Sequence, residues 1–577
     1  MDASCHGFGV VTCNSPHRII LDISAGTFHT VPVLKSVYHV LTSLQLINRF
    51  FLITKKSGVS WGLLMQERFL SSGIEDEKPL QERCGIVAIF GPPSLNQVPL
   101  ALRAGLGVQH RGQNGAGMTL QTENGITRYT GEGLLRDIFT PKVVEKKLSR
   151  ASRITLLHTR YGTSGDYRSD NIQPCMVRAS DGTDVVVIHN GEFANSEAMR
   201  ERVMGPTPEG VSDTYLFTQL LAQATGNSWE EKLVRTLESV KGAYSLAIQI
   251  GPQLFLARDE FGLRPLMLGR TSDGWIAASE THALDKVNVR PVREIKKNEI
   301  ARIDEQGLHT IREGVDGSGL CAFELAYFSR PDSLKPTYDE ESGIAEDPRN
   351  WRTISSFRHR CGEILAQEAP INNATFVVGV PDSGVAVGTS YAEASGVPYV
   401  QAILRDHFDT NGDKRLFMTD NDINAIGSKV LGKLSILNDS EMWEDAIVVI
   451  GDDSIVRGNV SRKIVEIIRS LGAKAVHWVI GFPAVAHRCY LGVSMRTEEE
   501  LIAAGHHSDP VAIAQEIGAD SVHYISHEGF VRASNRSGSV VIPRNPQEIF
   551  LANNLCGGCV TGIYPVDREG NIFQYAR

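Results

Sequence analysis

The spacing of apolar runs changes near residues 314–319, and this change restricts the fold more than any other feature of the sequence. Before it, short apolar runs and turns follow one another, with few helical segments, one of them beginning at Ser212 and Asp213. This strand-rich pattern predicts stacked sheets with a few helices. The apolar runs span residues 84–91, 154–158, 184–189, 243–250 and 254–257.

After the change, β-branched strands alternate with helical segments such as 460–471. Alternating strands and helices predict a parallel sheet in a doubly wound α/β domain. The strands are expected at 375–380, 447–450 and 476–480. We therefore divide the chain into a leader at 1–83, a first domain at 84–315 and a second domain at 316–577.

Composition excludes several classes of protein. The chain has 577 residues, and at about 150 residues per domain this predicts about three or four units. With 58 Lys+Arg and 67 Asp+Glu, the formal net charge is −9, which argues against a protein that mainly coats nucleic acid. The 9 cysteines are too few and too scattered for a disulfide scaffold, so a reducing intracellular setting is expected.

The first 83 residues differ from the rest in composition. From residue 1 to 64 there are acids only at Asp2 and Asp22. The apolar run at 31–53 contains Lys35, His39 and Arg49, whereas a membrane span needs about 20 uninterrupted apolar residues. A charged region typical of a secretory signal is missing at the start.

Three interpretations of this segment remain: an organelle transit peptide or propeptide, a translation start at Met65 with a short leader before Cys84, or a folded N-terminal domain. We expect the protein in the cytoplasm, or in a plastid or another organelle if residues 1–83 are a transit peptide. We expect no membrane partner.

Residues 447–460 contain the most specific local pattern. A predicted buried strand ends in Asp452 and Asp453, and the chain then turns through Ser454 and Gly458 into a helix. Ligands of open α/β sheets bind beyond the carboxyl ends of strands, and a helix N-terminus offers N–H groups to phosphate. Two adjacent carboxylates suit ribose hydroxyls or Mg²⁺. A capped helix without a ligand is the structural alternative.

The full string, Gly-Asp-Asp-Ser-Ile-Val-Arg-Gly, resembles the phosphoribosyl pyrophosphate signature of type I phosphoribosyltransferases, and most closely that of the amidophosphoribosyltransferase family. A second match is Gly-Val-Pro-Asp-Ser-Gly at 379–384, and a third lies at 323–333. The resemblance implies that Asp382, Ser383 and Gly384 contact pyrophosphate, and that Arg457 and Gly458 belong to the 5′-phosphate turn. It implies a Mg²⁺ site formed by Ser383, Asp452 and Asp453.

Cys84 has two interpretations. A small thiol within an apolar strand is commonly a buried core residue. If cleavage makes Cys84 the first residue, its own α-amine, with a pKa near ~8, serves as the base for the thiol.

Motifs further along the chain are similar to those of class II glutamine amidotransferases. They are Cys84-Gly-Ile, Gln109-His-Arg-Gly-Gln, His158-Thr-Arg-Tyr, His189-Asn-Gly and Ser212-Asp. The resemblance implies that Cys84 is the nucleophile, that Arg160 holds the α-carboxylate of glutamine and that Asp213 holds its α-ammonium. It implies an oxyanion hole from Asn190 and the Gly191 N–H, an Ntn-type αββα sandwich, and structural roles for His110 and His158.

Four cysteines have contexts similar to those of the iron–sulfur branch of the same family: Cys321, Cys489, Cys556 and Cys559. Four thiolates hold a [4Fe–4S] cluster, and zinc in a Cys₄ site is the chemical alternative. The resemblance implies a structural cluster that ties the linker to the C-terminal segment. Cys175 and Cys361 lack such a context and are expected to be inert core thiols.

The chain departs from the family pattern around the phosphoribosyl site. The 5′-phosphate turn of the family continues Arg-Gly-Thr-Thr, whereas here Asn459 and Val460 follow Gly458. The loop at 405–418 keeps only Arg415 and Phe417 as counterparts and carries added acids. In the basic stretch after it, Lys429 and Lys433 remain.

The resemblance implies that glutamine, phosphoribosyl pyrophosphate and water give phosphoribosylamine, glutamate and pyrophosphate, the first step of de novo purine synthesis. Ammonia passes internally between the two sites. Glutamine, phosphoribosyl pyrophosphate and purine nucleotide feedback ligands are the expected partners, and a homo-oligomer is the expected assembly. Two alternatives are a divergent paralogue with another phosphorylated acceptor and a nucleotide-binding regulator without turnover.

Overall fold

The structure is a computed structural model, and it describes residues 84–161, 171–317, 319–339, 344–405, 434–493, 495, 497–535 and 537–566, together with two short segments near the N-terminus. By its internal contacts the chain divides into two units, Met1–Pro79 and Leu80–Arg577. In the first unit, β1 (Val10–Val11) pairs antiparallel with β2 (Ile19–Ile20). The rest of 1–83 lies outside the described residues, so the interpretations of this segment stay predictions. Among the described residues, no helix has the length and apolar character needed to cross a membrane.

The first half of the second unit contains two antiparallel sheets. The seven-stranded sheet has the order β13-β11-β12-β3-β6-β4-β5, and the six-stranded sheet has the order β15-β14-β10-β9-β8-β7. The seven strands are β3 (Gly85–Phe90), β4 (Gly115–Thr122), β5 (Gly125–Glu132), β6 (Ile154–Arg160), β11 (Met267–Arg270), β12 (Trp275–Ala278) and β13 (Pro291–Glu294). The six strands are β7 (Cys175–Arg178), β8 (Asp184–Phe193), β9 (Gly242–Ile250), β10 (Gln253–Arg258), β14 (Ile300–Asp304) and β15 (Gly307–Arg312).

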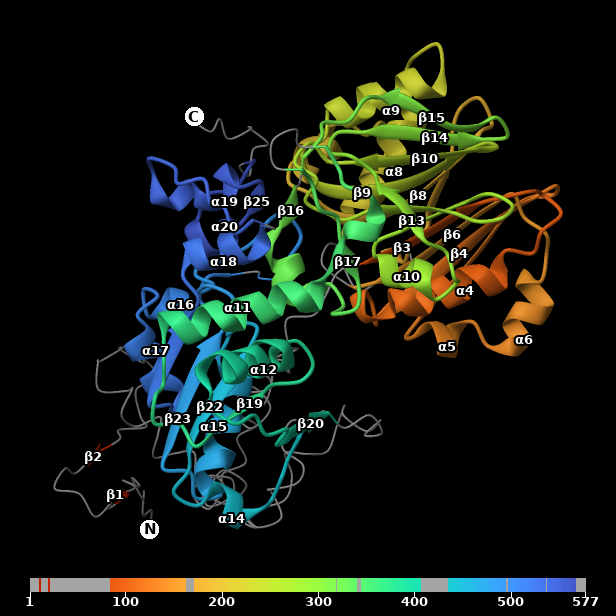
Figure 1. The fold of residues 1–577 in the computed structure, drawn as a ribbon. Helices are drawn as coiled ribbons and strands as arrows, with labels where there is room; N and C mark the ends of the chain where they lie inside the picture. Colours follow the sequence, from red (N-terminus) through yellow and green to blue (C-terminus); the bar gives the residue numbers. More distant parts are fainter. Residues whose placement is uncertain are drawn as a thin grey trace, which may run out of the picture. The chain divides into compact units, whose positions relative to one another are not determined.

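Alternating side chains of β3 explain the layers. Ile86 and Ala88 lie in the core between the sheets, whereas Val87 and Ile89 pack outward against helices. The helices α4 (Val98–Gly107) and α10 (Thr281–Asp285) cover the seven-stranded sheet, and α8 (Asp213–Gln223) and α9 (Trp229–Glu238) cover the six-stranded one (Figure 1). The predicted αββα sandwich is confirmed.

The second half contains the parallel sheet β19-β22-β23-β24. Its strands are β19 (Phe376–Gly379), β22 (Ile447–Asp452), β23 (Ala475–Ile480) and β24 (Ser521–Tyr524). On one face Val377 and Val449 pack toward α11 (Ile354–Glu368) and α12 (Gly384–Ser395). On the other face Val378 and Ile450 pack toward α15 (Asn459–Ser470) and α17 (Pro510–Ile517). The predicted doubly wound domain is confirmed.

A third group of elements joins the halves. β16 (Leu320–Cys321) pairs in parallel with β25 (Leu555–Cys556), and η4 (Glu324–Phe328) follows β16. The C-terminal helices are α18 (His527–Ser534), α19 (Ile549–Ala552) and α20 (Gly558–Thr561). The boundary predicted at residue 315 lies between β15 and β16, but the contacts unite Leu80–Arg577 in one unit, and the domain limits stay predictions.

Shorter elements complete the described fold. In the first half they are η1 (Gln109–Arg111), α5 (Leu135–Ile138), α6 (Pro141–Val143), η2 (Val144–Leu148) and α7 (Ser196–Arg202). In the second half they are β17 (Leu334–Lys335), η5 (Pro348–Asn350), β18 (Arg352–Thr353), β20 (Ile403–Arg405), β21 (Leu434–Ile436), α14 (Ser440–Trp443), α16 (Ile502–Gly505) and η6 (Pro546–Glu548).

Candidate active site

Cys84 lies directly before β3, the middle strand of the seven-stranded sheet. Its side chain is buried, and its Sγ donates to the Tyr161 carbonyl oxygen at 3.9 Å. Burial raises the pKa of the Cys84 thiol, while the contact with Tyr161 and the nearby Arg160 charge lower it. Because β6 pairs with β3, Arg160 at the end of β6 is brought beside Cys84. The structure thus brings together two residues that are 76 positions apart in the sequence.

Asp213 lies at the N-terminus of α8, where Ser212 caps the helix by accepting from the Tyr215 N–H. The Asp213 carboxylate accepts backbone N–H groups from Phe193 at 3.0 Å and from Thr214 at 2.7 Å. Its charge acts on the Cys84 thiol and raises the pKa of that thiol. The carboxylate is therefore fixed near the thiol, as the sequence predicts for a group that binds an ammonium.

Asn190 and Gly191 lie on β8, opposite Ser245 and Tyr244 of β9. Asn190 is fully buried, and neither atom of its amide group has a hydrogen-bond partner within the described part of the chain. Gly191 has φ +145°, and a Cβ there would meet the Ala243 carbonyl oxygen at 1.9 Å. Only glycine fits this position, and the buried Asn190 amide is available to a ligand.

Two histidines of the motifs, His158 and His189, are buried. His158 Nε2 donates to the His189 carbonyl oxygen at 3.2 Å and so joins β6 to β8. Burial lowers the pKa of His158 to about 3, and burial also lowers the pKa of His189. His110 Nε2 lies 2.9 Å from Glu280 Oε1. The structural roles expected for His110 and His158 stay predictions.

Sequence reasoning missed Glu192, which directly follows Gly191. Burial, followed by the charge of Asp213, raises the pKa of Glu192 to about 8. The only signal in the sequence was its position beside the His-Asn-Gly motif. Its carboxyl group is neutral below that pKa and adds little charge to the glutamine site.

The phosphoribosyl residues lie at the carboxyl ends of two neighbouring parallel strands. β19 pairs with β22 so that Gly379 stands opposite Gly451, and the loops that follow both strands meet. Ser383 Oγ donates to Asp453 Oδ1 at 2.5 Å. A Cβ at Gly384 would meet the Asp452 Cα at 2.7 Å, so glycine permits this close approach. The sequence predicted that these residues share one site, and the register brings them together.

Asp452 and Asp453 are nearly inaccessible, at 7% and 6% of full exposure. Burial raises the pKa of Asp452 well above its usual range, and the neighbouring Asp453 carboxyl raises it further. Burial also raises the pKa of Asp453, whereas hydrogen bonds from Ser383 and Ser454 lower it. Two adjacent buried carboxyl groups disfavour double ionisation unless a cation compensates them.

The phosphate turn differs from the expectation in one respect. Arg457 Nε donates to Glu500 Oε2 at 3.0 Å, and a second guanidinium nitrogen contacts the same oxygen. Sequence reasoning missed Glu500, because it lies 43 positions away with no motif around it. Gly458 precedes α15 with φ +80°, where a Cβ would meet Ile502 Cδ1 at 2.6 Å.

The remaining predicted ligand, Asp382, forms an ion pair with Arg405. The loop predictions that concern Arg415, Phe417, Lys429 and Lys433 lie outside the described residues. The Asn459 side chain, which stands where the family has a threonine, accepts from Arg462 Nη1 at 3.1 Å. Asp382, Arg457 and Asn459 are thus all bonded to other side chains of the protein.

The four predicted cluster cysteines are neighbours. Cys321 and Cys556 stand opposite each other in the β16–β25 pair, and the N–H groups of residues 486 and 487 donate to the Cys559 carbonyl oxygen. Burial raises the pKa of the Cys489 thiol to about 12, with a further contribution from Cys321. Burial also raises the pKa of Cys559 well above its usual range, followed by the charges of the other three thiols.

Among the described residues, no group of three or more His, Cys, Asp or Glu side chains is arranged to hold a metal ion. The four thiols are thus close without forming a finished site. The cysteines expected to be inert, Cys175 and Cys361, are both buried. Burial raises the pKa of Cys175 to about 12 and raises that of Cys361 as well.

Comparisons with known proteins agree with both halves. A family described as a glutamine amidotransferase domain matches residues 158–286. Amidophosphoribosyltransferase from Bacillus subtilis is 31% identical over 497 residues, which is 85% of this chain and 95% of the relative. The enzyme from Methanocaldococcus jannaschii is 32% identical over 504 residues, 84% of this chain and 98% of the relative. The chloroplastic amidophosphoribosyltransferase 3 of Arabidopsis thaliana is 34% identical over 507 residues, 86% of each chain.

Solved structures are similar over the same extent. The glutamine phosphoribosylpyrophosphate amidotransferase of Bacillus subtilis, complexed with ADP and GMP, has a TM-score of 0.70 at 30% identity. The match covers 85% of this chain and 99% of that one.

The fold and the sites define a glutamine amidotransferase joined to a phosphoribosyltransferase. The chain belongs to the amidophosphoribosyltransferase family. It is a glutamine-dependent pentosyltransferase, and its substrates are glutamine and phosphoribosyl pyrophosphate. It forms phosphoribosylamine, glutamate and pyrophosphate in the first step of de novo purine synthesis. The comparisons do not favour the alternative of a paralogue with another acceptor.

Proposed function

We propose that Cys84 is the nucleophile of glutamine hydrolysis and acts as the first residue of the active chain. The observation that carries this proposal is the convergence of Cys84, Arg160 and Asp213, because both charges act on the thiol. A buried thiol with a raised pKa needs a base to become a nucleophile. His158 stands opposite Ile86 in the pair of β3 and β6, and with a pKa of about 3 it is a poor base. A free α-amine on Cys84 meets this need.

In this proposal Arg160 binds the α-carboxylate of glutamine and Asp213 binds its α-ammonium. The sulfur of Cys84 forms a bond to the amide carbon, and the α-amine takes the thiol proton. The amide oxygen becomes negative and is held by Asn190 Nδ2 and the Gly191 N–H. Collapse breaks the C–N bond, the α-amine returns its proton and ammonia leaves. Water then cleaves the thioester and releases glutamate.

The N-terminus of the active enzyme tests this proposal. Intact mass and N-terminal sequencing of protein with glutaminase activity should give a chain that begins at Cys84. A variant in which residues 1–83 cannot be removed should hydrolyse glutamine at background rates. Full glutaminase activity with residues 1–83 still attached contradicts the proposal.

We propose that Ser383, Asp452 and Asp453 hold Mg²⁺ in the phosphoribosyl site. The chemistry of the donor set supports the ion, because buried paired carboxylates are costly without a cation. When bound, Mg²⁺ neutralises charge on the pyrophosphate leaving group.

We assign the predicted phosphoribosyl residues to the phosphate groups of phosphoribosyl pyrophosphate. Asp382, Ser383 and Gly384 are assigned to the pyrophosphate. Arg457 and Gly458 are assigned to the 5′-phosphate, and Arg457 exchanges its contact with Glu500 for the ligand. Ammonia from Cys84 passes internally and forms a C–N bond at ribose C1 as the bond to pyrophosphate breaks.

We propose that Cys321, Cys489, Cys556 and Cys559 hold a [4Fe–4S] cluster. Cys321 lies close enough to the other three thiols to raise their pKa values, and binding a metal as thiolates relieves the cost of their burial. The cluster supplies a cross-link between β16 and the C-terminal segment.

Metal analysis tests the cluster. Anaerobically purified protein should contain about four irons and four sulfides per chain. Cys556→Ala should lose iron and fold poorly, whereas Cys175→Ala, a buried cysteine outside the group, should retain iron. Stoichiometric zinc without iron or sulfide contradicts the cluster and favours the zinc alternative.

We propose that purine nucleotides inhibit the enzyme and that it forms a homo-oligomer. The first proposal is supported by the Bacillus subtilis relative, which was solved with ADP and GMP. Inhibition by both nucleotides, and a mass in solution above that of one chain, are the expected results. Full activity in millimolar ADP plus GMP, or a monomer at assay concentration, contradicts the respective proposal.

A further inference from the structure

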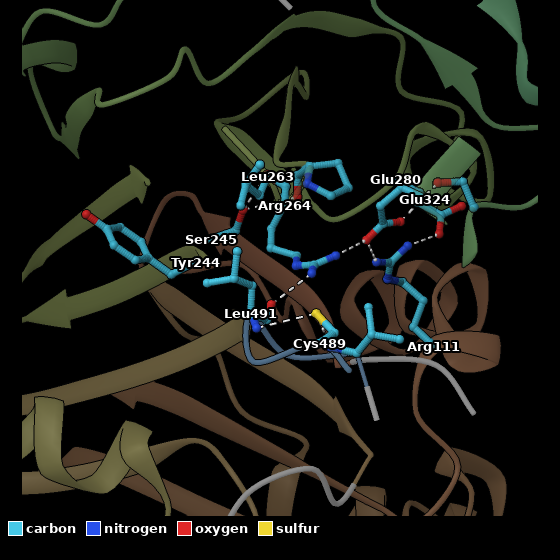
Figure 2. A network of polar contacts seen from close by, with 12 residues as sticks. Arg111, Tyr244, Ser245, Leu263, Arg264, Glu280, Glu324, Cys489 and Leu491 are labelled. Atoms are coloured by element: carbon cyan, nitrogen blue, oxygen red, sulfur yellow. Dashed lines mark hydrogen bonds and ion pairs between the residues drawn. The ribbon is translucent and has the colours of Figure 1, made fainter. Parts of the chain in front are cut away.

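A buried network of charges runs through the molecule between the glutamine site and the cysteines. Arg111, in the predicted Gln-His-Arg motif, contacts Glu280 at 2.5 Å and Glu324 at 2.7 Å. Glu324, three residues after Cys321, contacts Arg264 Nη1 at 3.1 Å. The side chains of all four residues are at most 2% exposed, and Figure 2 shows them as one connected group. Removing one partner of a buried ion pair destabilises the fold, because the other charge is left buried and uncompensated.

Arg264 has contacts outside the network on two sides. Its Nη2 donates to the Leu491 carbonyl oxygen at 2.9 Å, and the N–H of Leu491 donates to Cys489 Sγ at 3.4 Å (Figure 2). Its own carbonyl oxygen accepts from Ser245 Oγ at 2.8 Å. Ser245 stands opposite Asn190 in the β8–β9 pair. Arg264 therefore connects residues 489–491, here called the cysteine loop, with β9, the strand that pairs with the Asn190 and Gly191 segment of β8.

Apolar packing follows the same path. Ala243 packs in one cluster with Leu491, Cys556 and Tyr564. The Ala243 carbonyl oxygen also occupies the position that a Cβ on Gly191 would need. Ala243, near the start of β9, thus lies between Gly191 on one side and the cysteine segment, which contains Leu491 and Cys556, on the other. A displacement of the cysteine segment would therefore reach Gly191 through β9.

We propose that Arg264 is a positioning residue of the glutaminase, which holds the cysteine loop at Leu491 against β9 and thereby sets the geometry of Asn190 and Gly191. The proposal rests on the proposed role of these two residues as the oxyanion hole. A guanidinium has several donors in a fixed fork, so it reaches both Glu324 and the Leu491 carbonyl. The compact ammonium of lysine keeps the buried charge near Glu324 but does not span both partners.

The test variant is therefore Arg264→Lys, which preserves charge and leaves Glu324 with a cation. Its matched control is Arg293→Lys. Arg293 is a partly buried arginine of the same half that donates to both carboxylate oxygens of Glu299 and to the Glu294 carbonyl oxygen, and none of these partners lies in β9 or beside the four cysteines. Thermal unfolding and iron content of both variants show whether they remain folded.

Oxyanion donors act in the transition state, so their displacement lowers kcat more than it changes KM. Removing one such donor costs about 10²–10³ in kcat, and partial displacement should cost about 10-fold or more. We expect Arg264→Lys to lower kcat for glutamine by at least about 10-fold, with KM within about 3-fold and ammonia-dependent synthesis unchanged. Arg293→Lys should keep kcat within about 3-fold.

Equal losses of kcat in both lysine variants, or an Arg264→Lys variant that loses glutamine- and ammonia-dependent activity alike, overturn the positioning role and indicate a general structural one. A rise in KM at unchanged kcat also overturns it. Asn190→Ala separates this proposal from the function on which it rests. If Asn190→Ala keeps its glutaminase kcat, the oxyanion assignment itself is wrong, whatever Arg264→Lys does.

Discussion

The glutamine site and the phosphoribosyl site differ in how their polar groups are satisfied. At the glutamine site the Asn190 amide is buried without a partner among the described residues, and the Ala243 carbonyl oxygen lies where a Cβ on Gly191 would stand. At the phosphoribosyl site Ser383 is bonded to Asp453, and Arg457 is bonded to Glu500. The first site thus holds unused hydrogen-bonding capacity, whereas the second has used much of its own.

The two substrates therefore differ in how much of their binding energy is lost to the replacement of internal contacts. Glutamine gains contacts with groups that are already placed, because rigid strands of two sheets hold them. Phosphoribosyl pyrophosphate and its cation must replace internal contacts, and each replacement removes part of the binding energy. We therefore expect substitutions at the first site to affect rate and substitutions at the second to affect binding.

The largest effect is expected for Cys84→Ser. A weaker nucleophile at the same position should lower glutamine-dependent synthesis by at least about 1000-fold, because the covalent step depends on the thiol. Synthesis from high ammonia should remain within about 3-fold of wild type, since the second site is unchanged. Initial rates with each nitrogen donor measure this. Equal loss with both donors would mean that Cys84 supports the whole fold rather than one reaction.

The next effect concerns the buried acids. Asp452→Asn should lower synthesis from both glutamine and ammonia by about 100-fold, because both routes use one acceptor site. Cys361→Ser, a change of a buried thiol in the same half, serves as the control for general damage. An Asp452→Asn variant that still uses ammonia at the wild-type rate is the contrary result.

The same variant should be more stable in the absence of divalent cations. The folded-state pKa of Asp452 is raised, so its contribution to stability is present at low pH and is lost as the pH rises through that pKa. Asn at this position removes the loss, and Tm should rise at pH 8 more than at pH 4. About 1 kcal/mol corresponds to a shift of about 2–4 °C in a domain of this size. Thermal unfolding with EDTA at both pH values measures it, and a lower Tm at pH 8 is the opposite outcome.

The smallest effect is expected in the phosphate turn. Two threonine hydroxyls that bond a charged phosphate are each worth about 1.5–3 kcal/mol, so their absence predicts weak binding of phosphoribosyl pyrophosphate. Asn459→Thr with Val460→Thr should tighten binding by about 10-fold, less than the full value because the α15 N-terminus already contributes. Calorimetry with Mg²⁺ compares wild type and the double variant. Tight wild-type binding that the threonines do not improve would show that the turn is already compensated.

The sequence predicted the layers well because their hydrophobic patterns are local. The run at 154–158 became β6, and the helix expected at 460–471 became α15, with boundaries shifted by one or two residues. Within the sites, motifs placed Asp213 and Asp452 correctly at a helix N-terminus and a strand end. The partners that satisfy them are distant in sequence, and no local pattern predicts such contacts.

Glu500 and Glu324 illustrate what the sequence left out. Glu500 is one of many acids in an acidic chain, and Glu324 lies in the match at 323–333 without an assigned role. Only the folded structure brings Glu500 to Arg457 and Glu324 to Arg111 and Arg264. The resemblance of the four cysteine contexts to the iron–sulfur branch of the family indicated a common site, but not the residue that links them to the glutamine site. That link depends on β9 packing against the cysteine loop, which is a tertiary contact.

The most direct test of the central claim is the stoichiometry of the complete reaction. The active enzyme is incubated with glutamine, Mg²⁺ and phosphoribosyl pyrophosphate, and glutamate and pyrophosphate are measured together over time. We expect the two products to form in equal amounts, and pyrophosphate formation to stop in Cys84→Ser until ammonia is supplied. Glutamate release without pyrophosphate, at saturating phosphoribosyl pyrophosphate, would contradict the coupling of the two sites.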